Sequence, residues 1–311
     1  LRLYDDVTYP LPKTFYDDYA GRLAAQKQKM SIIKDMDLVY DLKLADKENE
    51  IRCQPGPAKA GRAMYERMTP AQKVAWDKHY DPIIKKFKED KLTGKALAEW
   101  KYQRYMHDYM RVIHSVDRNV GRVIDYLRKH NLLDNTLIVY TSDQGFYMGE
   151  HGWFDKRFMY EESFRTPLLI YMPGGKRGDI AEMVQNIDYA PTFLQLAGVQ
   201  VPKDIQGVSM LPLLKGKRVP WRKSLYYHYY EFPDEHNVCR HYGVKDQRYV
   251  LIHFYDDIDA WELYDLKTDP SQLNNIYGKP GTETITRNLK KELLRLQEQY
   301  DDPIRHKMVK E

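Results

Sequence analysis

Apolar, β-branched residues form one short run at residues 136–141, and turn-forming residues border this run on both sides. The run reads T-L-I-V-Y-T, and S-D-Q-G follows it. A continuous apolar run of this length, bounded by turn signals, is typical of a strand buried on both faces of a parallel sheet. Ligands bind just beyond the carboxyl ends of such strands. We therefore expect a buried strand here, with Asp143 and Gln144 placed where a binding site would lie.

A long helical pattern precedes this strand. Between residues 95 and 130, apolar residues recur every three or four positions, which is the period of an amphipathic helix. The stripe contains Met106, Tyr109, Met110, Ile113, Val116, Val120, Val123, Ile124 and Leu127. We expect this stripe to be core, because the helix should pack on the sheet and lead into the strand as one α/β unit.

Further upstream, residues 46–95 form a charged insertion. One helix is expected to begin inside it at Thr69, because T-P-A-Q provides an N-cap, a proline at the first helical position and a capping-box glutamine. We expect this helix to run to about Tyr80. Pro82 should then stop it, because proline breaks helix interiors.

Shorter elements follow the central run. A second strand is expected at residues 168–172 and a third at residues 183–187. Asp188 is then expected to cap a helix at residues 189–197, with Gly198 as the stop signal. We interpret Asp188 as a structural cap rather than a catalytic residue.

The pattern changes after Gly216, where short strands replace the α/β units. The expected strands are residues 225–231, 241–245, 249–255 and 261–266, and an amphipathic helix is expected at residues 283–300. Asp246 and Gln247 fit a tight hairpin turn. We therefore expect two domains, residues 1–216 and 217–311, the second built from short strands and one helix.

Composition narrows the class of protein. The 311 residues are 42% hydrophobic, enough for a sizeable core, and the net charge of +4 is too small to indicate a nucleic-acid partner. No run approaches the ~18 consecutive apolar residues of a membrane span. Two cysteines do not make a disulfide framework. We interpret the 26 tyrosines mainly as core and strand packing, with sugar contacts as the alternative.

The central stretch resembles the type I sulfatases, the formylglycine-dependent sulfuric ester hydrolases of the alkaline phosphatase superfamily. The matching motifs are, in order, T-S-D-Q-G, E-H-G-W-F-D-K and Y-E-E-S-F-R-T-P-L-L-I. D-Y-A-P-T-F-L-Q-L-A-G-V and W-E-L-Y-D-L-K-T-D-P extend the resemblance over nearly the whole chain, except the insertion. The resemblance implies an α/β fold. Residues 1–216 would be part of an alkaline-phosphatase-like α/β/α sandwich, and residues 217–311 a small α+β C-terminal subdomain.

This resemblance also implies a site. Asp143 and Gln144 would be two ligands of a Ca²⁺ ion, and carboxylate and amide oxygens are the hard donors that such ions prefer. Lys156 matches the family lysine that contacts the sulfate and the leaving-group oxygen. The family nucleophile is a hydrated formylglycine from a Cys-x-Pro-Ser-Arg signature, which would lie upstream with two further metal-binding aspartates. We therefore expect this chain to be the C-terminal portion of a longer enzyme, inactive without its N-terminal half.

His151 has two interpretations within the same motif. It could have the structural role of orienting the loop, or a functional role in which it contacts substrate or, as a catalytic residue, assists the leaving group. Glu150 and Glu161 are interpreted as structural residues that pair with Lys or Arg and fix the loop.

A second polar cluster lies at residues 229–243, between two strands of the C-terminal subdomain. His236, Arg240 and His241 provide donors suited to sugar hydroxyls or carboxylates, and loops on rigid scaffolds often carry recognition. The cluster resembles that of sulfatases that act on N-acetylglucosamine-6-sulfate and related glycan sulfates, as in glycosaminoglycans. The alternative is a structural loop whose polar groups satisfy their own backbone.

Cys53 begins the string C-Q-P-G-P-A-K-A-G-R, which superficially matches the formylglycine signature. Gly56 stands where serine is usual, and the signature's arginine is absent from its position. A nucleophilic cysteine also needs an activating pocket. We interpret Cys53 as an incidental surface cysteine.

Two other functions stay open. A phosphatase or phosphodiesterase of the same superfamily usually places His after the Asp to hold Zn²⁺ or Mn²⁺, whereas Gln144 favours an oxygen-ligated Ca²⁺. A non-catalytic, glycan-binding pseudo-sulfatase would lack a residue that can become formylglycine upstream.

The sequence also leads to expectations about partners and location. The expected partners are a sulfated carbohydrate and the N-terminal half of the same protein, with no nucleic acid and no membrane. The family resemblance implies an exported protein, periplasmic or secreted in a bacterium and lysosomal in a eukaryote.

Overall fold

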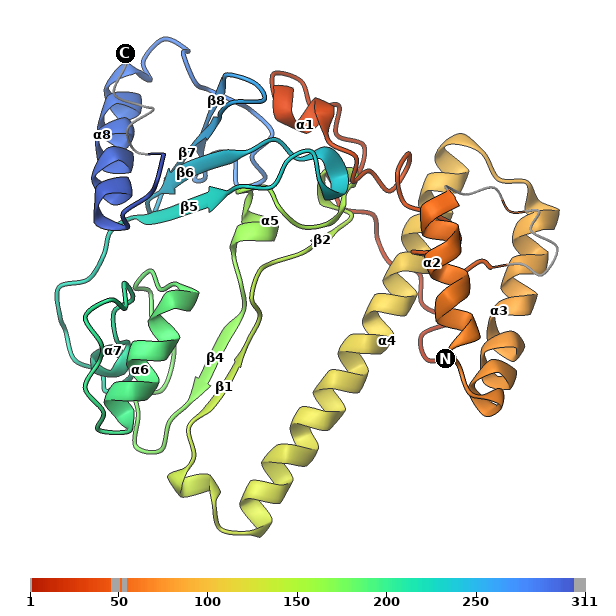
Figure 1. Ribbon diagram of the computed structural model, residues 1–311, viewed down its shortest axis with the longest axis horizontal. Helices are drawn as coiled ribbons and strands as arrows, with labels where there is room; N and C mark the ends of the chain where they lie inside the picture. The colour runs from red at the N-terminus through yellow and green to blue at the C-terminus, as the bar shows by residue number, and fades with distance from the viewer. Residues whose placement is uncertain (1, 46–50, 52–54, 305–311) are drawn as a thin grey trace. The chain divides into compact units, whose positions relative to one another are not determined.

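A computed structural model describes residues 2–45, 51 and 55–304 (Figure 1). The helices are α1 (Leu23–Lys27), α2 (Pro55–Glu66), α3 (Pro70–Asp90), α4 (Gly94–Lys129), α5 (Glu161–Phe164), α6 (Tyr189–Leu196), α7 (Leu211–Leu214) and α8 (Glu283–Gln299). The strands are β1 (Ile138–Thr141), β2 (Tyr147–Met148), β3 (Phe154–Asp155), β4 (Leu168–Tyr171), β5 (Leu225–Tyr229), β6 (His241–Lys245), β7 (Tyr249–Phe254) and β8 (Ala260–Asp265).

The chain divides into two compact units. The first unit consists of Leu1–Asp17, Lys29–Tyr126 and Tyr147–Asp155, and the second of Asp18–Gln28, Leu127–Phe146 and Lys156–Glu311. The domain boundary expected after residue 216 stays a prediction.

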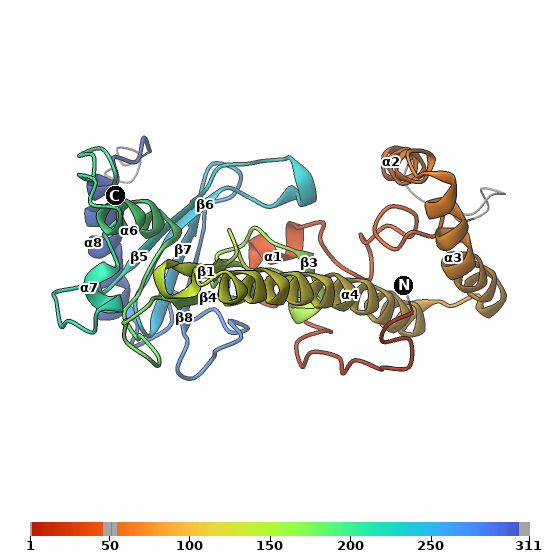
Figure 2. The same ribbon diagram turned by 90° about the horizontal axis from the view of Figure 1, so that it is seen from below.

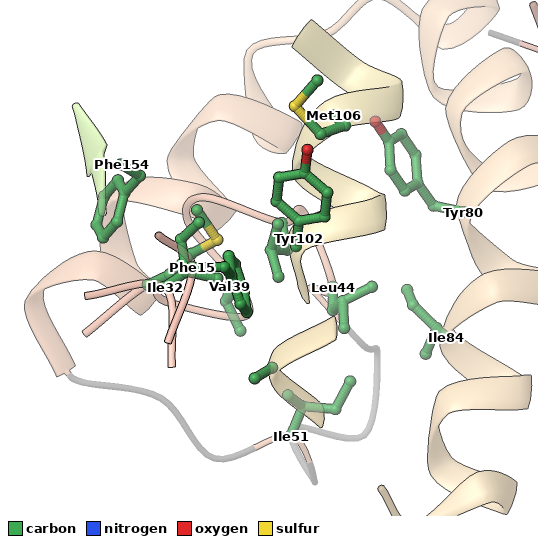
Figure 3. Packing of buried hydrophobic residues seen from close by; sticks show 13 residues of the cluster. Phe15, Ile32, Val39, Leu44, Ile51, Tyr80, Ile84, Tyr102, Met106 and Phe154 are labelled. Atoms are coloured by element: carbon green, nitrogen blue, oxygen red, sulfur yellow. The ribbon is translucent and has the colours of Figure 1, made fainter. Parts of the chain in front are cut away.

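The first unit has a core of aromatic and aliphatic side chains from α3, α4 and the N-terminal loops (Figure 3). Tyr102 and Met106 of α4 belong to the same buried cluster as Tyr80 and Ile84 of α3. Phe15 meets Tyr102 edge-on, with the ring centroids 5.3 Å apart. Burial of each such side chain contributes about 1.5–3 kcal/mol, so this cluster holds α3 and α4 together.

Helix α3 begins as the sequence predicts. Thr69 Oγ1 accepts a hydrogen bond from Gln72 N–H at 3.3 Å, and Gln72 Oε1 accepts one from Thr69 N–H at 2.8 Å. The predicted end before Pro82 is wrong, because the helix continues to Asp90 with Pro82 inside it. Proline in a helix interior costs about 3 kcal/mol. Burial of Ile84 and its apolar neighbours against the core offsets that cost.

Helix α4 occupies the predicted span, but its apolar stripe is core only in the first half. Met106 is 8% exposed, whereas Ile113, Val116 and Val123 are 41%, 43% and 58% exposed. The prediction that the whole stripe is core is therefore wrong for the described chain. The reason is that the apolar cluster covering α4 in the first unit reaches only as far as Met110.

Strands β1 and β4 form an antiparallel ribbon in the second unit, with Val139 opposite Ile170 and Tyr140 opposite Leu169. Both predicted strands are thus confirmed. The expected burial of the first strand on both faces of a parallel sheet is wrong here, because Tyr140 is 40% exposed. Within the described residues β1 has one neighbouring strand, β4. An apolar strand becomes buried on both faces only where further strands and covering helices are present.

The third predicted strand, at residues 183–187, is absent from the described structure. The segment is irregular and enters a 3₁₀ turn at Asn186–Asp188, directly before α6. Helix α6 is followed by Gly198 with φ +73°, in agreement with the predicted stop. A left-handed residue after a helix is the usual position for glycine.

Asp188 is fully buried, and its side chain makes no capping hydrogen bond to α6. Its carboxylate instead accepts hydrogen bonds from the N–H groups of Gln185 and Val208, both at 2.8 Å. The guanidinium of Arg222 donates to both of its oxygens, with Nη2 at 2.7 Å from Oδ1. Asp188 is therefore structural, as predicted, but it anchors three separate segments rather than capping the helix.

Strands β5 to β8 form one antiparallel sheet in sequence order, with α8 beside it (Figure 1, Figure 2). Leu289, Leu293 and Leu296 of α8 belong to the same buried cluster as strand residues such as Val244 and Leu251. The predicted strands, the hairpin between β6 and β7 and the C-terminal helix are all confirmed, with ends that differ by one or two residues.

His241, the first residue of β6, is fully buried. Its Nδ1–H donates to the Cys239 carbonyl at 2.8 Å, and the rings of Phe254 and Tyr229 have centroids 4.9 and 5.3 Å away. Its Nε2 has no hydrogen-bond partner in the part of the chain that the structure describes. Burial lowers the pKa of His241 to about 4. The ring is therefore neutral in the folded protein at neutral pH.

We expect Asp188→Ala to destabilise the protein by about 3–5 kcal/mol, because it leaves the Arg222 charge and two N–H groups without their acceptor. Urea denaturation measures this free energy of unfolding. The matched control is Asp204→Ala, since Asp204 is exposed, and it should change the free energy by less than about 0.5 kcal/mol. Equal effects of the two substitutions would contradict the anchoring role.

His241 should make stability depend on pH. The folded state keeps this ring neutral down to a pKa of about 4, whereas the unfolded chain binds a proton below about pH 6.5. The contribution of His241 to the free energy of unfolding is fully present above pH 6.5 and is lost as the pH falls toward 4.

We expect His241→Phe to flatten the stability profile between pH 6.5 and 4 in denaturant titrations, because phenylalanine fits an aromatic site and takes up no proton. The control is His130→Phe at an exposed histidine, which should keep the original slope. An unchanged slope in His241→Phe would show that this ring does not control the acid sensitivity.

Candidate functional site

A hollow of about 1820 Å³ opens in the second unit. Its walls include the turn after β1, the loop after β3, strand β5, and parts of β4 and β6. Asp143, Gln144 and Lys156 all line it. The structure thus brings together three of the side chains that the sequence singles out.

Asp143 and Gln144 follow β1 directly. Asp143 is exposed. Its Oδ1 accepts hydrogen bonds from Gln144 N–H at 3.1 Å and from the Ser142 hydroxyl at 3.2 Å. These local bonds hold the carboxylate in a tight turn at the strand end. The carboxylate therefore keeps oxygen lone pairs for a cation.

Gly145 packs this turn against α5. Its N–H donates to the Ser163 carbonyl at 2.8 Å. A Cβ at this position would lie 2.0 Å from the Glu162 carbonyl oxygen. Only glycine allows the two backbones to approach so closely, and this explains the third residue of the D-Q-G motif.

The donors fit part of a site for a hard divalent cation. Carboxylate and amide oxygens are the ligands that Ca²⁺ and Mg²⁺ prefer, and Ca²⁺ takes about 6–8 of them. No group of three or more His, Cys, Asp or Glu side chains within residues 2–45, 51 and 55–304 could hold a metal ion. Asp143 and Gln144 would supply two of these oxygen ligands.

Lys156 is half-buried and stands in an irregular loop after β3. Asp155 has φ +72° and Arg157 has φ +115°, so both neighbours lie in the region that favours glycine. A non-glycine residue held there costs on the order of 1–3 kcal/mol and persists only where its surroundings impose it.

The surroundings of Arg157 impose its conformation through two hydrogen bonds. Its N–H donates to Ser163 Oγ at 2.9 Å, and its carbonyl accepts from the Tyr227 hydroxyl at 2.7 Å. Burial raises the pKa of Tyr227, so this hydroxyl stays protonated and remains a donor. The backbone that follows Lys156 is thus held on both sides.

Glu161 and Lys245 form an ion pair in the wall of the hollow, with side chains 20% and 14% exposed. This pair agrees with the structural role expected for Glu161. In the first unit, Glu150 Oε2 accepts a hydrogen bond from Met148 N–H at 2.8 Å.

His151 belongs to the first unit, where it is fully buried. Its Nδ1 lies 2.8 Å from Asp17 Oδ2, and its N–H donates to Thr14 Oγ1 at 3.0 Å. The residue also has φ +56°. These contacts support the interpretation that His151 orients its loop, and its catalytic role stays a prediction.

His236, Arg240 and His241 do not line the hollow among the described residues. Arg240 donates to Asp257 Oδ1 and to the Phe232 carbonyl, both at 3.0 Å, and also to the Tyr230 carbonyl. His236 has φ +65°. The hydrogen bonds of Arg240 favour a structural role for this loop. The substrate-binding roles of all three residues stay predictions.

Residues Ser163 and Tyr227 escaped the sequence analysis. Ser163 is 5% exposed, and nothing in Y-E-E-S-F marks its hydroxyl as a partner of a distant backbone. The string L-Y-Y-H-Y places Tyr227 and Tyr229 on one face of β5 by strand alternation. That alternation could have singled out Tyr227, but with 26 tyrosines in the chain it does not distinguish this residue from those that pack in the core. Cys53 lies outside the described residues, and Cys239 is a buried free cysteine.

Comparison with known proteins extends these observations. The sulfatase family profile matches residues 18–199, and the N-sulphoglucosamine sulphohydrolase C-terminal profile matches residues 149–299. A protein of Bacteroides thetaiotaomicron described as N-acetylglucosamine-6-O-sulfatase is 47% identical over 308 residues, 97% of this chain and 55% of the relative. A multifunctional alkaline phosphatase superfamily protein of Trinickia caryophylli is 32% identical over 68% of this chain and 44% of its own.

A solved structure agrees with these matches. It is described as a complex with its substrate D-glucosamine-2-N,6-O-disulfate, and it superposes with a TM-score of 0.90 at 46% identity. The superposition covers 97% of this chain and 62% of that one. The chain spans about half the length of these two curated relatives.

These findings confirm the predicted fold class, an alkaline-phosphatase-like α/β fold followed by a small C-terminal region with an antiparallel sheet. The sulfatase profile covers the turn with Asp143, the lysine loop and α6, and the second profile continues through the C-terminal sheet into α8. With more than half of its length matched by the first profile, the chain belongs to the sulfatase family.

Proposed function

We propose that this chain supplies one wall of the active site of an enzyme that hydrolyses sulfate esters on glycans, such as the 6-sulfate of N-acetylglucosamine units in glycosaminoglycans. The observation that carries the proposal is the meeting of Asp143, Gln144 and Lys156 in one hollow. The substrate class is supported by the 47% identity to an N-acetylglucosamine-6-O-sulfatase.

Sulfate-ester hydrolysis needs a nucleophile, a cation beside the sulfate oxygens, and positive charge or a proton at the leaving oxygen. Lys156 would place its ammonium group against the bound sulfate and the leaving-group oxygen. A positive charge fixed there stabilises the negative charge that develops as the ester bond breaks. The sulfatase family uses a formylglycine nucleophile, which we place in the N-terminal part of the complete enzyme.

Membership of the family also implies a divalent metal. We propose Ca²⁺, held in part by the Asp143 carboxylate and the Gln144 amide oxygen. When bound, such an ion neutralises charge on the sulfate oxygens. The role of Asp143 is to present its carboxylate at the strand end, and Gln144 adds a neutral oxygen from the same turn.

A phosphatase or phosphodiesterase activity is the second candidate, because a multifunctional relative of the alkaline phosphatase superfamily is 32% identical. Gln144 favours oxygen ligation and thus the sulfatase. A side-by-side assay of the complete enzyme on N-acetylglucosamine-6-sulfate and N-acetylglucosamine-6-phosphate separates the two. Faster turnover of the phosphate would overturn the main proposal. Turnover of neither, with tight binding of the sulfated sugar, would point to a pseudo-sulfatase.

The proposed partners are a sulfated carbohydrate and the N-terminal half of the same protein. We propose that the enzyme is exported, as the sulfatase family suggests. In the part of the chain that the structure describes, no helix combines the length and the apolar character needed to cross a membrane.

We expect Asp143→Ala in the complete enzyme to lose bound Ca²⁺ and to abolish activity, because it removes an anionic ligand. Elemental analysis of the purified, folded protein measures the metal directly. Asp134→Ala is a matched control at the opposite end of β1, where Asp134 is exposed, and it should keep the metal. Full metal content in Asp143→Ala would refute the ligand assignment.

We expect Lys156→Ala to lower kcat/KM by roughly 10²-fold or more, as loss of a charge that acts in the transition state does. Thermal melting should remain close to that of the parent, since Lys156 is half-buried at the wall of a hollow. Lys267→Ala, at an exposed lysine of the C-terminal region, serves as the control. Near-native turnover by Lys156→Ala would show that this lysine has no part in the chemistry.

A further inference from the structure

The loop that presents Lys156 has a backbone that its own sequence does not favour. Arg157 has φ +115°, and Asp155 has φ +72°. Neither residue is glycine, so local preference alone would let both relax to negative φ. A relaxed loop would aim the Lys156 side chain in another direction, because side-chain direction follows the backbone of the residue and of its neighbours.

Two hydroxyl groups oppose that relaxation. The Ser163 hydroxyl accepts from Arg157 N–H, and the Tyr227 hydroxyl donates to the Arg157 carbonyl. The two bonds therefore hold the N–H and the carbonyl of Arg157, the residue that directly follows Lys156. Ser163 lies in α5, 6 residues after Arg157, whereas Tyr227 lies in β5, 70 residues after it.

Both hydroxyls are themselves held in place. Ser163 is 5% exposed, its N–H donates to the Tyr160 carbonyl at 3.0 Å, and its carbonyl accepts from Gly145 N–H. The Tyr227 ring packs edge-on against Phe164, with centroids 5.4 Å apart, and lies 5.5 Å from the His241 ring. These contacts leave the two hydroxyl groups little freedom to follow a relaxing loop.

Ser163 also connects the lysine loop to the turn with the metal donors. Its hydroxyl bonds the residue after Lys156, and its carbonyl bonds Gly145, two positions after Asp143. One buried residue thus sets the spacing between the two chemical groups of the site. Effective catalysis depends on such spacing, because a displacement of about 1 Å can cost 10²-fold in rate.

We propose that Ser163 and Tyr227 are positioning residues, which fix the direction of Lys156 through the backbone of Arg157. The proposal rests on the function proposed above for Lys156. It assigns the C-terminal sheet, through β5, a direct part in aligning the reacting groups rather than a purely structural one.

The test uses Tyr227→Phe in the complete enzyme with N-acetylglucosamine-6-sulfate as the probe. The substitution removes one hydroxyl and keeps the ring. Loss of one positioning hydrogen bond should lower kcat roughly 3- to 10-fold. KM should change by less than about 2-fold, because Lys156 acts mainly in the transition state. An unchanged kcat would overturn the proposal.

A double-mutant cycle separates positioning from general damage. In the Lys156→Ala background, Tyr227→Phe should change kcat by less than about 2-fold, because the group that it positions is gone. If the two effects instead multiply, Tyr227 acts independently of Lys156, and the proposal is wrong. Full activity of the single variant Lys156→Ala would instead defeat the proposed function itself, so the two failures are distinguishable.

Ser163→Ala provides a second variant, in case Tyr227→Phe folds poorly. It should show the same fall in kcat and the same loss of effect in the Lys156→Ala background. Tyr249→Phe is the matched control, a tyrosine of β7 in the same sheet that does not line the hollow among the described residues. A fall in kcat for Tyr249→Phe equal to that of Tyr227→Phe would also contradict the proposal.

Discussion

The site depends on one backbone contact, the hydrogen bond from Gly145 N–H to the Ser163 carbonyl. The absence of a side chain at Gly145 allows the turn after β1 to lie directly on the backbone of α5. Ser163 then uses its hydroxyl to hold the backbone that follows Lys156. Ser163 therefore connects the turn that carries Asp143 to the loop that carries Lys156.

Exposure to water weakens the electrostatic effects of Asp143 and Lys156 in the described structure. Asp143 is exposed and Lys156 is half-buried, so water screens both charges in the described structure. A fixed charge becomes a strong catalytic device only in a site from which water is excluded.

The sequence predicts those parts of the fold that local signals determine. Thr69 and Gln72 carry a complete capping box, and Asp246 marks the hairpin between β6 and β7, so both appear as expected. Other predictions fail because contacts with distant residues override a local signal. Pro82 fails to end α3, because burial of the following turn outweighs a local helix breaker. The apolar stripe correctly predicts helix α4. Its periodicity does not indicate how much of the helix other side chains cover.

The candidate site shows the same division between local and distant information. The sequence points to the D-Q-G turn and to Lys156 because both belong to motifs within one short stretch of the chain. The conformation of Arg157 was not, because an arginine at φ +115° has no sequence signature and is imposed from elsewhere. One of its two holding bonds comes from Tyr227, 70 residues along the chain. Since strain of this kind survives only where folded neighbours enforce it, the conformation of the lysine loop depends on the C-terminal sheet that supplies Tyr227. Strand β5 therefore contributes to the energetics of the candidate site, whereas the C-terminal region was expected to contribute only recognition.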